Sequence, residues 1–157
     1  MNLLLLSRKT GKALEKKGQT LVTAESCTGG WVAQAVTSVA GSSDWFERGY
    51  VTYSNAAKRE ALGVSKDTLA RHGAVSEQTA RAMARGALKR GRGSVALAIT
   101  GIAGPGGGLP GKPVGTVCFA WARGRKMRSE TKRFRGGRGR VRRQSVIHAL
   151  RGVLRCL

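Results

Sequence analysis

Short apolar runs alternate along the chain with longer segments in which apolar residues recur at helical spacing. Residues 76–90 give the clearest helix, because apolar positions recur there at i, i+3, i+4, i+7 and i+8. Ser76 is a favourable N-cap, and Glu77 suits the first turn, where the helix dipole favours negative charge. Residues 95–100 are instead continuously apolar over the length of one strand, as in a sheet that is covered on both faces. The pattern therefore predicts buried strands that alternate with helices.

The same criteria assign the rest of the 157 residues. Helices are predicted over 2–17, from 28–30 to about 39, over 56–62, 76–90 and about 139–155, and strands over 20–24, 49–54, 95–100, 114–122 and 127–134. Asn55 is the predicted N-cap of the helix at 56–62, and the last two strands would form a hairpin across residues 123–125. The sequence shows no internal repeat and no long linker, so we expect one three-layer α/β domain over residues 1–157.

Positive charge dominates the composition, because 29 Lys and Arg stand against 8 Asp and Glu and give a formal net charge of +21. Residues 123–157 alone hold 13 basic residues and one acidic residue, Glu130. A basic surface attracts anions, so nucleic acid, acidic lipid and a phosphorylated substrate are all candidate partners. Non-specific nucleic-acid contact through 123–157 is one hypothesis, and an ordinary solvated surface is the alternative.

Cysteines are few and scattered along the chain. Cys27, Cys118 and Cys156 are odd in number and lack the paired spacing of a disulfide framework or a zinc site. We therefore expect no metal, and reduced thiols in a cytoplasm. The leucine run at 3–6 is too short for a secretory signal, and no segment approaches the ~20 apolar residues of a membrane span. We expect no membrane partner.

Three polar or glycine-rich loops each follow a predicted strand. Residues 25–30 follow the first strand, residues 53–55 with Lys58 follow the second, and residues 100–108 follow the strand at 95–100. Ligands of open α/β sheets bind outside the carboxyl ends of the strands. The three loops could therefore converge on one pocket.

Ser26 lies at a predicted tight bend before a helix, where free backbone N–H groups could stabilise an oxyanion. A serine hydroxyl needs a base, and no histidine is close to Ser26 in sequence. Lys58 is a candidate base, because burial or a positive helix end would lower its pKa toward neutrality. The alternative interpretation is that Ser26 and Thr28 only cap a helix and that Lys58 is a surface lysine.

Cys27 is a rival nucleophile at the same helix end. Adjacent side chains point in different directions, so only one of Ser26 and Cys27 should face a substrate, and we interpret Cys27 as a small buried residue. The third loop has six glycines in residues 101–111, which let backbone N–H groups approach an anion. The loop lacks the Gly-Lys-Ser/Thr ending of a P-loop, so taken alone it also fits a mobile surface loop.

Six stretches of the chain carry a further signal: 23–30 (TAESCTGG), 39–43 (VAGSS), 45–55 (WFERGYVTYSN) with Lys58, 72–77 (HGAVSE), 100–107 (TGIAGPGG) and 112–116 (KPVGT). In this order they resemble the CinA C-terminal domain family over nearly the whole chain. The resemblance implies a three-layer α/β/α domain with a mixed, mostly parallel sheet of about five strands. It also implies hydrolysis of the carboxamide of nicotinamide mononucleotide, in pyridine-nucleotide recycling, without a metal or an organic cofactor.

The resemblance also assigns roles to individual residues. The family's serine nucleophile and lysine base fall on Ser26 and Lys58. The expected substrate-binding residues are Glu25, Cys27, Thr28, Gly29, Gly30, Tyr53, Asn55, Thr100, Gly101 and Arg142. Gly137 stands where the family usually carries an acid, and Gly106, Gly107 and Gly108 stand where relatives often have more polar residues.

Pockets in small domains of this kind are often completed by a neighbouring copy, so we expect a homodimer that acts on a small nucleotide. Two alternatives to the amidohydrolase stay open from the sequence. One is a catalytically silent nucleotide-binding domain, and the other is a basic nucleic-acid-binding module.

Overall fold

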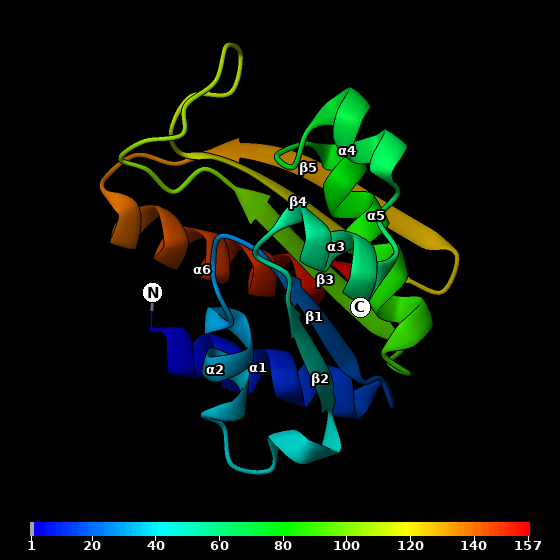
Figure 1. The fold of residues 1–157 in the computed structure, drawn as a ribbon. Helices are drawn as coiled ribbons and strands as arrows, with labels where there is room; N and C mark the ends of the chain where they lie inside the picture. Colours follow the sequence, from blue (N-terminus) through cyan, green and yellow to red (C-terminus); the bar gives the residue numbers. More distant parts are fainter. Residues whose placement is uncertain (1) are drawn as a thin grey trace.

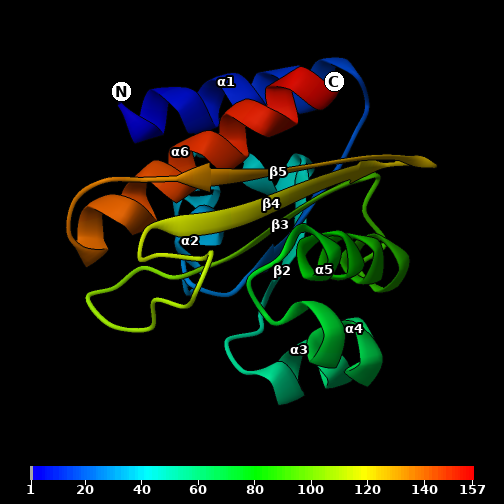
Figure 2. The ribbon, with the colours of Figure 1, turned by 90° about the horizontal axis from the view of Figure 1, so that it is seen from above.

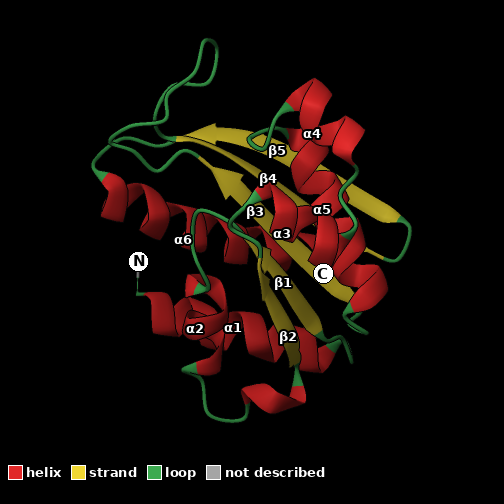
Figure 3. Cartoon of the chain, viewed as in Figure 1, coloured by secondary structure: helices red, strands yellow, loops and turns green. Residues whose placement is uncertain are grey.

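The computed structural model describes residues 2–157, which form one five-stranded sheet with helices against both faces (Figure 1; Figure 3). The strands are β1 (Leu21–Glu25), β2 (Phe46–Val51), β3 (Val95–Gly101), β4 (Thr116–Arg123) and β5 (Lys126–Arg133). The helices are α1 (Leu3–Lys16), α2 (Trp31–Thr37), α3 (Asn55–Leu62), α4 (Lys66–His72), α5 (Glu77–Arg90) and α6 (Arg138–Cys156), with a 3-10 turn at Ser42–Asp44. One face of the sheet is covered by α1, α2 and α6, and the other by α3, α4 and α5 (Figure 2). This confirms the predicted three-layer arrangement.

The strand order in the sheet is β2-β1-β3-β4-β5. β1 pairs in parallel with β2 and with β3, whereas β4 pairs antiparallel with β3 and with β5. Four of the five strands therefore run in one direction, which confirms the mixed, mostly parallel sheet. The carboxyl ends of β2, β1 and β3 meet at one edge, and the three loops singled out in the sequence follow those ends.

The two faces of the central strands carry side chains of very different size. Toward α1, α2 and α6 the sheet presents large apolar side chains, among them Leu97, Ile99, Phe119 and Trp121. Toward α5 the alternate positions are small, among them Ala96, Ala98, Ala120 and Ala122. Because successive residues of a strand point to opposite faces, the apolar run in β3 is buried on both sides, as predicted. The alanine face lets α5 pack close to the sheet.

Two local predictions around the second loop were wrong. β2 spans Phe46–Val51, earlier than the predicted strand at 49–54, because it pairs with β1 and stops where β1 stops. The chain then turns toward α3. The N-cap of α3 is Ser54 and not Asn55, since the Ser54 hydroxyl accepts a hydrogen bond from the Ala57 N–H at 3.0 Å.

The sequence analysis did not predict α4. The helix has a side-chain N-cap, since Ser65 Oγ accepts from the Thr68 N–H at 3.0 Å. None of its residues is fully buried, so the helix lacks the apolar stripe on which the prediction depended. The capping signal at Ser65 was the available evidence for it.

Gly152 should be essential to the packing of α6 against β4. A Cβ atom at this position would overlap the indole ring of Trp121, whose Nε1 donates to the Ala149 carbonyl at 2.9 Å. We expect Gly152→Ala to lower the free energy of unfolding by about 1–3 kcal/mol, the usual cost of overpacking. Urea denaturation measures the change.

Gly139→Ala is the matched control in the same helix, because nothing lies within 4 Å of the place that a Cβ atom would take there. This substitution should leave stability unchanged or raise it by about 0.5–1 kcal/mol, since alanine favours a helix over glycine. A Gly152→Ala protein as stable as the Gly139→Ala protein would contradict the close packing of α6.

Candidate active site

Ser26 follows β1 directly, at the edge where three strands end. Its backbone N–H donates to the Ile99 carbonyl of β3 at 2.9 Å, and the Thr52 N–H donates to the Glu25 carbonyl at 2.8 Å. These two bonds fasten the loops after β1 and β2 to neighbouring strands. Only 8% of Ser26 is exposed, so its hydroxyl lies in a recess and not on open surface.

Lys58 comes from the first half of α3, and its side chain is buried, with 1% exposed. The Nζ atom lies 3.1 Å from Ser26 Oγ, 3.1 Å from the Thr52 carbonyl oxygen and 3.4 Å from the Tyr53 carbonyl oxygen. None of these three partners is charged. Burial without a carboxylate partner disfavours the ammonium form and lowers the pKa of Lys58 from its ordinary value.

Lys58 Nζ can donate to all three oxygens as an ammonium, and a neutral amine can also make the three contacts. A neutral amine has two N–H donors and one lone pair. The two carbonyls of Thr52 and Tyr53 can accept the two hydrogens, which leaves the lone pair for the Ser26 hydroxyl. In its neutral form Lys58 can therefore accept the proton of Ser26.

Glu25 is buried, with 1% exposed, and shapes the loop of residues 25–30 that carries Ser26, which we call the serine loop. Its carboxylate accepts hydrogen bonds from Thr28 Oγ1 at 2.7 Å and from the N–H groups of Val32 and Ala33 at 2.9 and 3.1 Å. It therefore caps the N-terminus of α2. Gly29 and Gly30, whose φ angles are +60° and +99°, allow the turn between β1 and that helix.

A cavity of about 270 Å³ opens over the Ser26–Lys58 contact. Seven of the predicted site residues line it: Ser26, Cys27, Tyr53, Asn55, Lys58, Thr100 and Gly101. Glu25, Thr28, Gly29 and Gly30 do not line it, and the structure places them in support of the serine loop. Thr100 Oγ1 is itself engaged, because it donates to the Ala74 carbonyl at 2.7 Å.

The loop between β3 and β4 supplies the opposite wall, and it rises away from the sheet in Figure 1. Gly104, Gly106 and Gly107 all line the cavity. Within residues 2–157 the backbone N–H groups of these glycines donate to no protein acceptor. They are therefore available to an anion or to a polarised carbonyl oxygen.

Arg142, expected at the substrate, does not line the cavity. Its guanidinium donates to the carbonyls of Cys27 and Thr28 at 3.0 and 3.2 Å, and it lies over the Trp31 ring, 5.5 Å from the ring centre. Arg142 therefore supports the serine loop through its backbone carbonyls, on the side away from the cavity.

Arg138 lines the cavity instead and was missed by the sequence analysis. It donates to the Gly104 carbonyl at 2.8 Å and to the Tyr53 hydroxyl at 3.1 Å, so it bridges the mouth of the site. Arg138 and Arg142 are one helical turn apart in α6, so the sequence alone could not tell which one faces the cavity.

Cys27 is buried, with 6% exposed. Burial raises the pKa of the Cys27 thiol to about 12, so the thiol is protonated at neutral pH. A protonated, buried thiol is a poor nucleophile. This agrees with the interpretation of Cys27 as a small buried residue.

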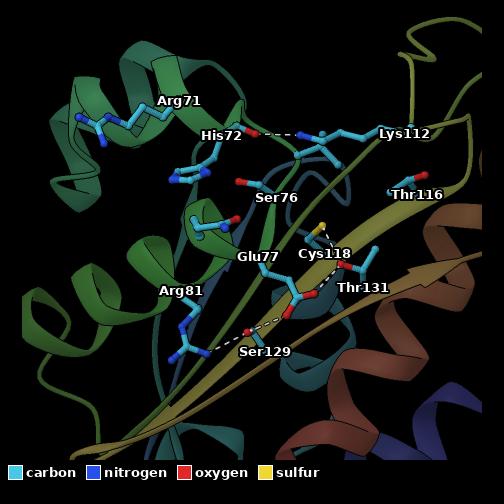
Figure 4. Close-up of a pocket in the computed structure, with 13 residues that line it drawn as sticks. Arg71, His72, Ser76, Glu77, Arg81, Lys112, Thr116, Cys118, Ser129 and Thr131 are labelled. Atoms are coloured by element: carbon cyan, nitrogen blue, oxygen red, sulfur yellow. Dashed lines mark hydrogen bonds between the residues drawn. The ribbon is translucent and has the colours of Figure 1, made fainter.

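A larger cleft of about 780 Å³ lies elsewhere, between the start of α5 and strands β4 and β5 (Figure 4). Its polar groups largely bind one another. The Glu77 carboxylate accepts from Ser129 Oγ at 2.9 Å and from Thr131 Oγ1 at 2.8 Å, and Lys112 Nζ donates to the His72 carbonyl at 2.8 Å. The cleft holds no buried nucleophile–base pair comparable to Ser26 and Lys58, so the smaller cavity is the candidate active site.

Residues 2–157 contain no group of three His, Cys, Asp or Glu side chains placed to hold a metal ion. In the same range no helix is both long and apolar enough to cross a membrane. The cysteines Cys27, Cys118 and Cys156 are free thiols.

Lys58→Met should change how stability depends on pH. The pKa of Lys58 is lower in the folded protein than the ordinary 10.5 of the unfolded chain. Between these two values the unfolded chain binds a proton that the folded protein lacks, so the stability of the natural protein rises with pH across that window. The stability of Lys58→Met relative to the natural protein should therefore be highest below the folded pKa of Lys58 and should fall as the pH approaches 10.5.

Urea denaturation at several pH values measures this trend. Lys66→Met, at an exposed position on α4, is the control and should show no comparable pH-dependent difference from the natural protein. A constant stability difference between Lys58→Met and the natural protein would show that the buried amine does not titrate differently after folding.

Known proteins resemble the chain in both sequence and fold. The sequence profile of the CinA C-terminal domain matches residues 5–157. The chain is 56% identical over 150 residues to the nicotinamide-nucleotide amidohydrolase PncC of Escherichia coli (strain K12), covering 94% of this chain and 90% of that protein. It is 50% identical over 149 residues to the protein of the same name from Pseudomonas putida, covering 95% and 93%.

The crystal structure of the competence/damage inducible protein CihA from Agrobacterium tumefaciens superposes on the chain with a TM-score of 0.95. The sequence identity is 45%, and the match covers 98% of this chain and 94% of that one. Both the sequence profile and the fold thus match over almost the entire length. The chain belongs to the CinA C-terminal domain family.

Proposed function

We propose that the protein is a nicotinamide-nucleotide amidohydrolase that converts nicotinamide mononucleotide to nicotinate mononucleotide and ammonia. The observation that carries the proposal is the 3.1 Å contact between the buried Lys58 amine and the Ser26 hydroxyl inside a cavity. The names of the relatives from Escherichia coli and Pseudomonas putida supply the substrate class. The reaction would serve pyridine-nucleotide recycling.

The reaction proceeds through a covalent intermediate on Ser26. Neutral Lys58 accepts the hydroxyl proton as Ser26 Oγ attacks the carboxamide carbon. The tetrahedral intermediate collapses when Lys58 returns this proton to the amide nitrogen, which leaves as ammonia. A water molecule, deprotonated by Lys58, then attacks the acyl carbon, and Ser26 Oγ departs with the proton to release the nicotinate product.

Backbone N–H groups are the proposed donors to the developing oxyanion. The Ser26 N–H is occupied by the Ile99 carbonyl, so it is not one of them. Gly104, Gly106 and Gly107 line the same cavity, and their unoccupied N–H groups are the proposed donors to the oxyanion or to the substrate phosphate. Arg138 would add a charged contact to the phosphate or ribose, and Tyr53 and Asn55 complete the rim.

Ser26→Ala should abolish ammonia release from nicotinamide mononucleotide while the protein stays folded. We expect a fall in kcat of about 1000-fold or more, the usual effect of removing a covalent nucleophile. Cys27→Ala is the adjacent control and should stay within about threefold of the natural kcat, because a buried protonated thiol takes no part.

An ammonia-release assay across several pyridine nucleotides measures both variants and the substrate range. An unchanged kcat in Ser26→Ala would overturn the mechanism. If the natural protein is stabilised by the nucleotide but releases no ammonia, the catalytically silent nucleotide-binding domain is the correct alternative.

Replacing Arg138 should weaken substrate binding, whereas replacing Arg142 should lower the stability of the fold. Arg138→Ala should raise KM by about tenfold, as expected from the loss of one charge-assisted hydrogen bond to the substrate. Arg142→Ala should lower the free energy of unfolding by about 1–2 kcal/mol, because the carbonyls of Cys27 and Thr28 lose their donor. Steady-state kinetics and urea denaturation on both variants separate the two roles, and a KM change confined to Arg142→Ala would reverse the assignment.

The homodimer expected from the sequence stays a prediction. The 60% exposure of Tyr53 at the rim leaves room for a neighbouring chain beside the cavity.

A further inference from the structure

A large share of the molecule's net positive charge lies on α6 and β5. α6 carries six arginines and no acidic residue, and β5 carries four basic residues and one acidic residue, Glu130. Arg140, Arg151 and Arg155 are spaced so that they fall within about 60° of arc on the helix, on its exposed side. The helix therefore presents an arginine stripe.

β5 extends this stripe toward the edge of the sheet, next to α6 (Figure 2). The Glu130 carboxylate lies 2.9 Å from His148 Nε2 and 3.0 Å from Arg155 Nη2, both on α6. Arg128 and Lys132 are two residues before and after Glu130 in the strand, so they project from the same face of the sheet. We call Arg128, Lys132, Arg140, Arg151 and Arg155 the basic face.

Little of this charge is neutralised within the molecule. Glu130 is the acidic side chain of the region, and it already contacts Arg155, Lys132 and His148. Among residues 2–157 no carboxylate lies within ion-pair distance of Arg128, Arg140 or Arg151. Their counter-ions must come from solution or from a partner.

We propose that the basic face binds duplex nucleic acid through its phosphate backbone. The stripe from Arg140 to Arg155 is about 22 Å long at 1.5 Å per residue. A duplex presents about a dozen phosphates over this length, of which one side faces the protein. Binding that depends on phosphates alone is independent of sequence.

The side chains near the basic face exclude recognition by base stacking. Phe119 and Trp121 are buried, and Phe134 is half-buried and packs edge-on against Phe119 and His148. Single-strand binding usually relies on exposed aromatic rings, so a duplex is the better-suited partner.

The face is also unsuited to a membrane surface. A helix that lies on a membrane inserts exposed apolar side chains beside its basic ones. The large apolar side chains exposed on the described surface are Leu4, Leu5, Val51, Tyr53 and Leu109, and none lies on α6 or β5. Leu4 and Leu5 lie on α1, so acidic lipid is included as an arm of the test.

The test uses the full chain and a fluorescent DNA duplex of about 20 base pairs, with binding measured by anisotropy over a range of salt concentrations. The variant is the triple reversal Arg128→Glu, Arg140→Glu and Arg151→Glu. We expect the variant to bind the duplex about 100-fold more weakly near 0.1 M salt. A plot of the logarithm of the binding constant against the logarithm of the salt concentration should have a slope that is shallower by about three.

The matched control reverses the same amount of charge on the opposite layer, with Lys66→Glu, Arg85→Glu and Lys89→Glu on exposed positions of α4 and α5. This protein should bind the duplex within about threefold of the natural chain at the same salt concentration. Equal weakening by both triple variants would show that net charge alone acts, and would overturn the proposal.

Two other outcomes also overturn it. One is duplex affinity that does not change with salt, and the other is tighter binding to phosphatidylserine vesicles than to the duplex. The proposal does not rest on the amidohydrolase assignment, because none of the basic-face residues lines the Ser26 cavity. At about 0.15 M salt, where exposed charges more than about 8 Å apart are largely screened, ammonia release by the Arg128, Arg140 and Arg151 reversal variant should stay close to that of the natural protein, which keeps the two conclusions separately testable.

Discussion

The candidate site depends on one buried amine. Lys58 Nζ has no carboxylate to pair with, and its neighbours are a hydroxyl and two backbone carbonyls. The two carbonyls belong to Thr52 and Tyr53, in the short segment between β2 and α3. Because these carbonyls accept hydrogen bonds from Nζ, they offset part of the cost of burying the Lys58 amine. The serine loop on the other side is held in place from two directions, by the Glu25 cap on α2 and by Arg142 behind it. Ser26 is thus held in contact with Lys58 partly by Glu25 and Arg142, neither of which lines the cavity.

The sequence predicted the fold well where burial produces a regular spacing of apolar residues along the chain. The apolar run of β3, the amphipathic α5 and the C-terminal stripe of α6 all lie where the pattern placed them. It failed where local hydrogen bonds decide. The end of β2 is set by its partner strand, and α4 is fixed by a serine cap without a buried face. Neither feature produces a hydrophobic period.

Sequence patterns were limited in a similar way at the candidate active site. Spacing and family resemblance brought together Ser26, Lys58, Tyr53, Asn55 and Thr100, because all follow the carboxyl ends of parallel strands. They did not separate residues that face the cavity from those that support it. Glu25 and Thr28 were expected at the substrate and instead bond to each other. Arg138 and Arg142 are four residues apart and lie on nearly the same face of α6, so the choice between them depends on where the helix begins relative to the cavity, which the helical pattern leaves uncertain by about one turn.

The net charge of +21 has a consequence for turnover in the proposed reaction. Conversion of a carboxamide to a carboxylate adds one negative charge to the ligand, so a positive protein holds the product more tightly than the substrate. A field that speeds the arrival of an anionic nucleotide therefore also delays the departure of the acid formed from it. Ions in solution screen both effects, with a screening length of about 10 Å at 0.1 M. Salt would then slow capture and hasten release, and the balance between these two steps would set the ionic strength at which the enzyme turns over fastest.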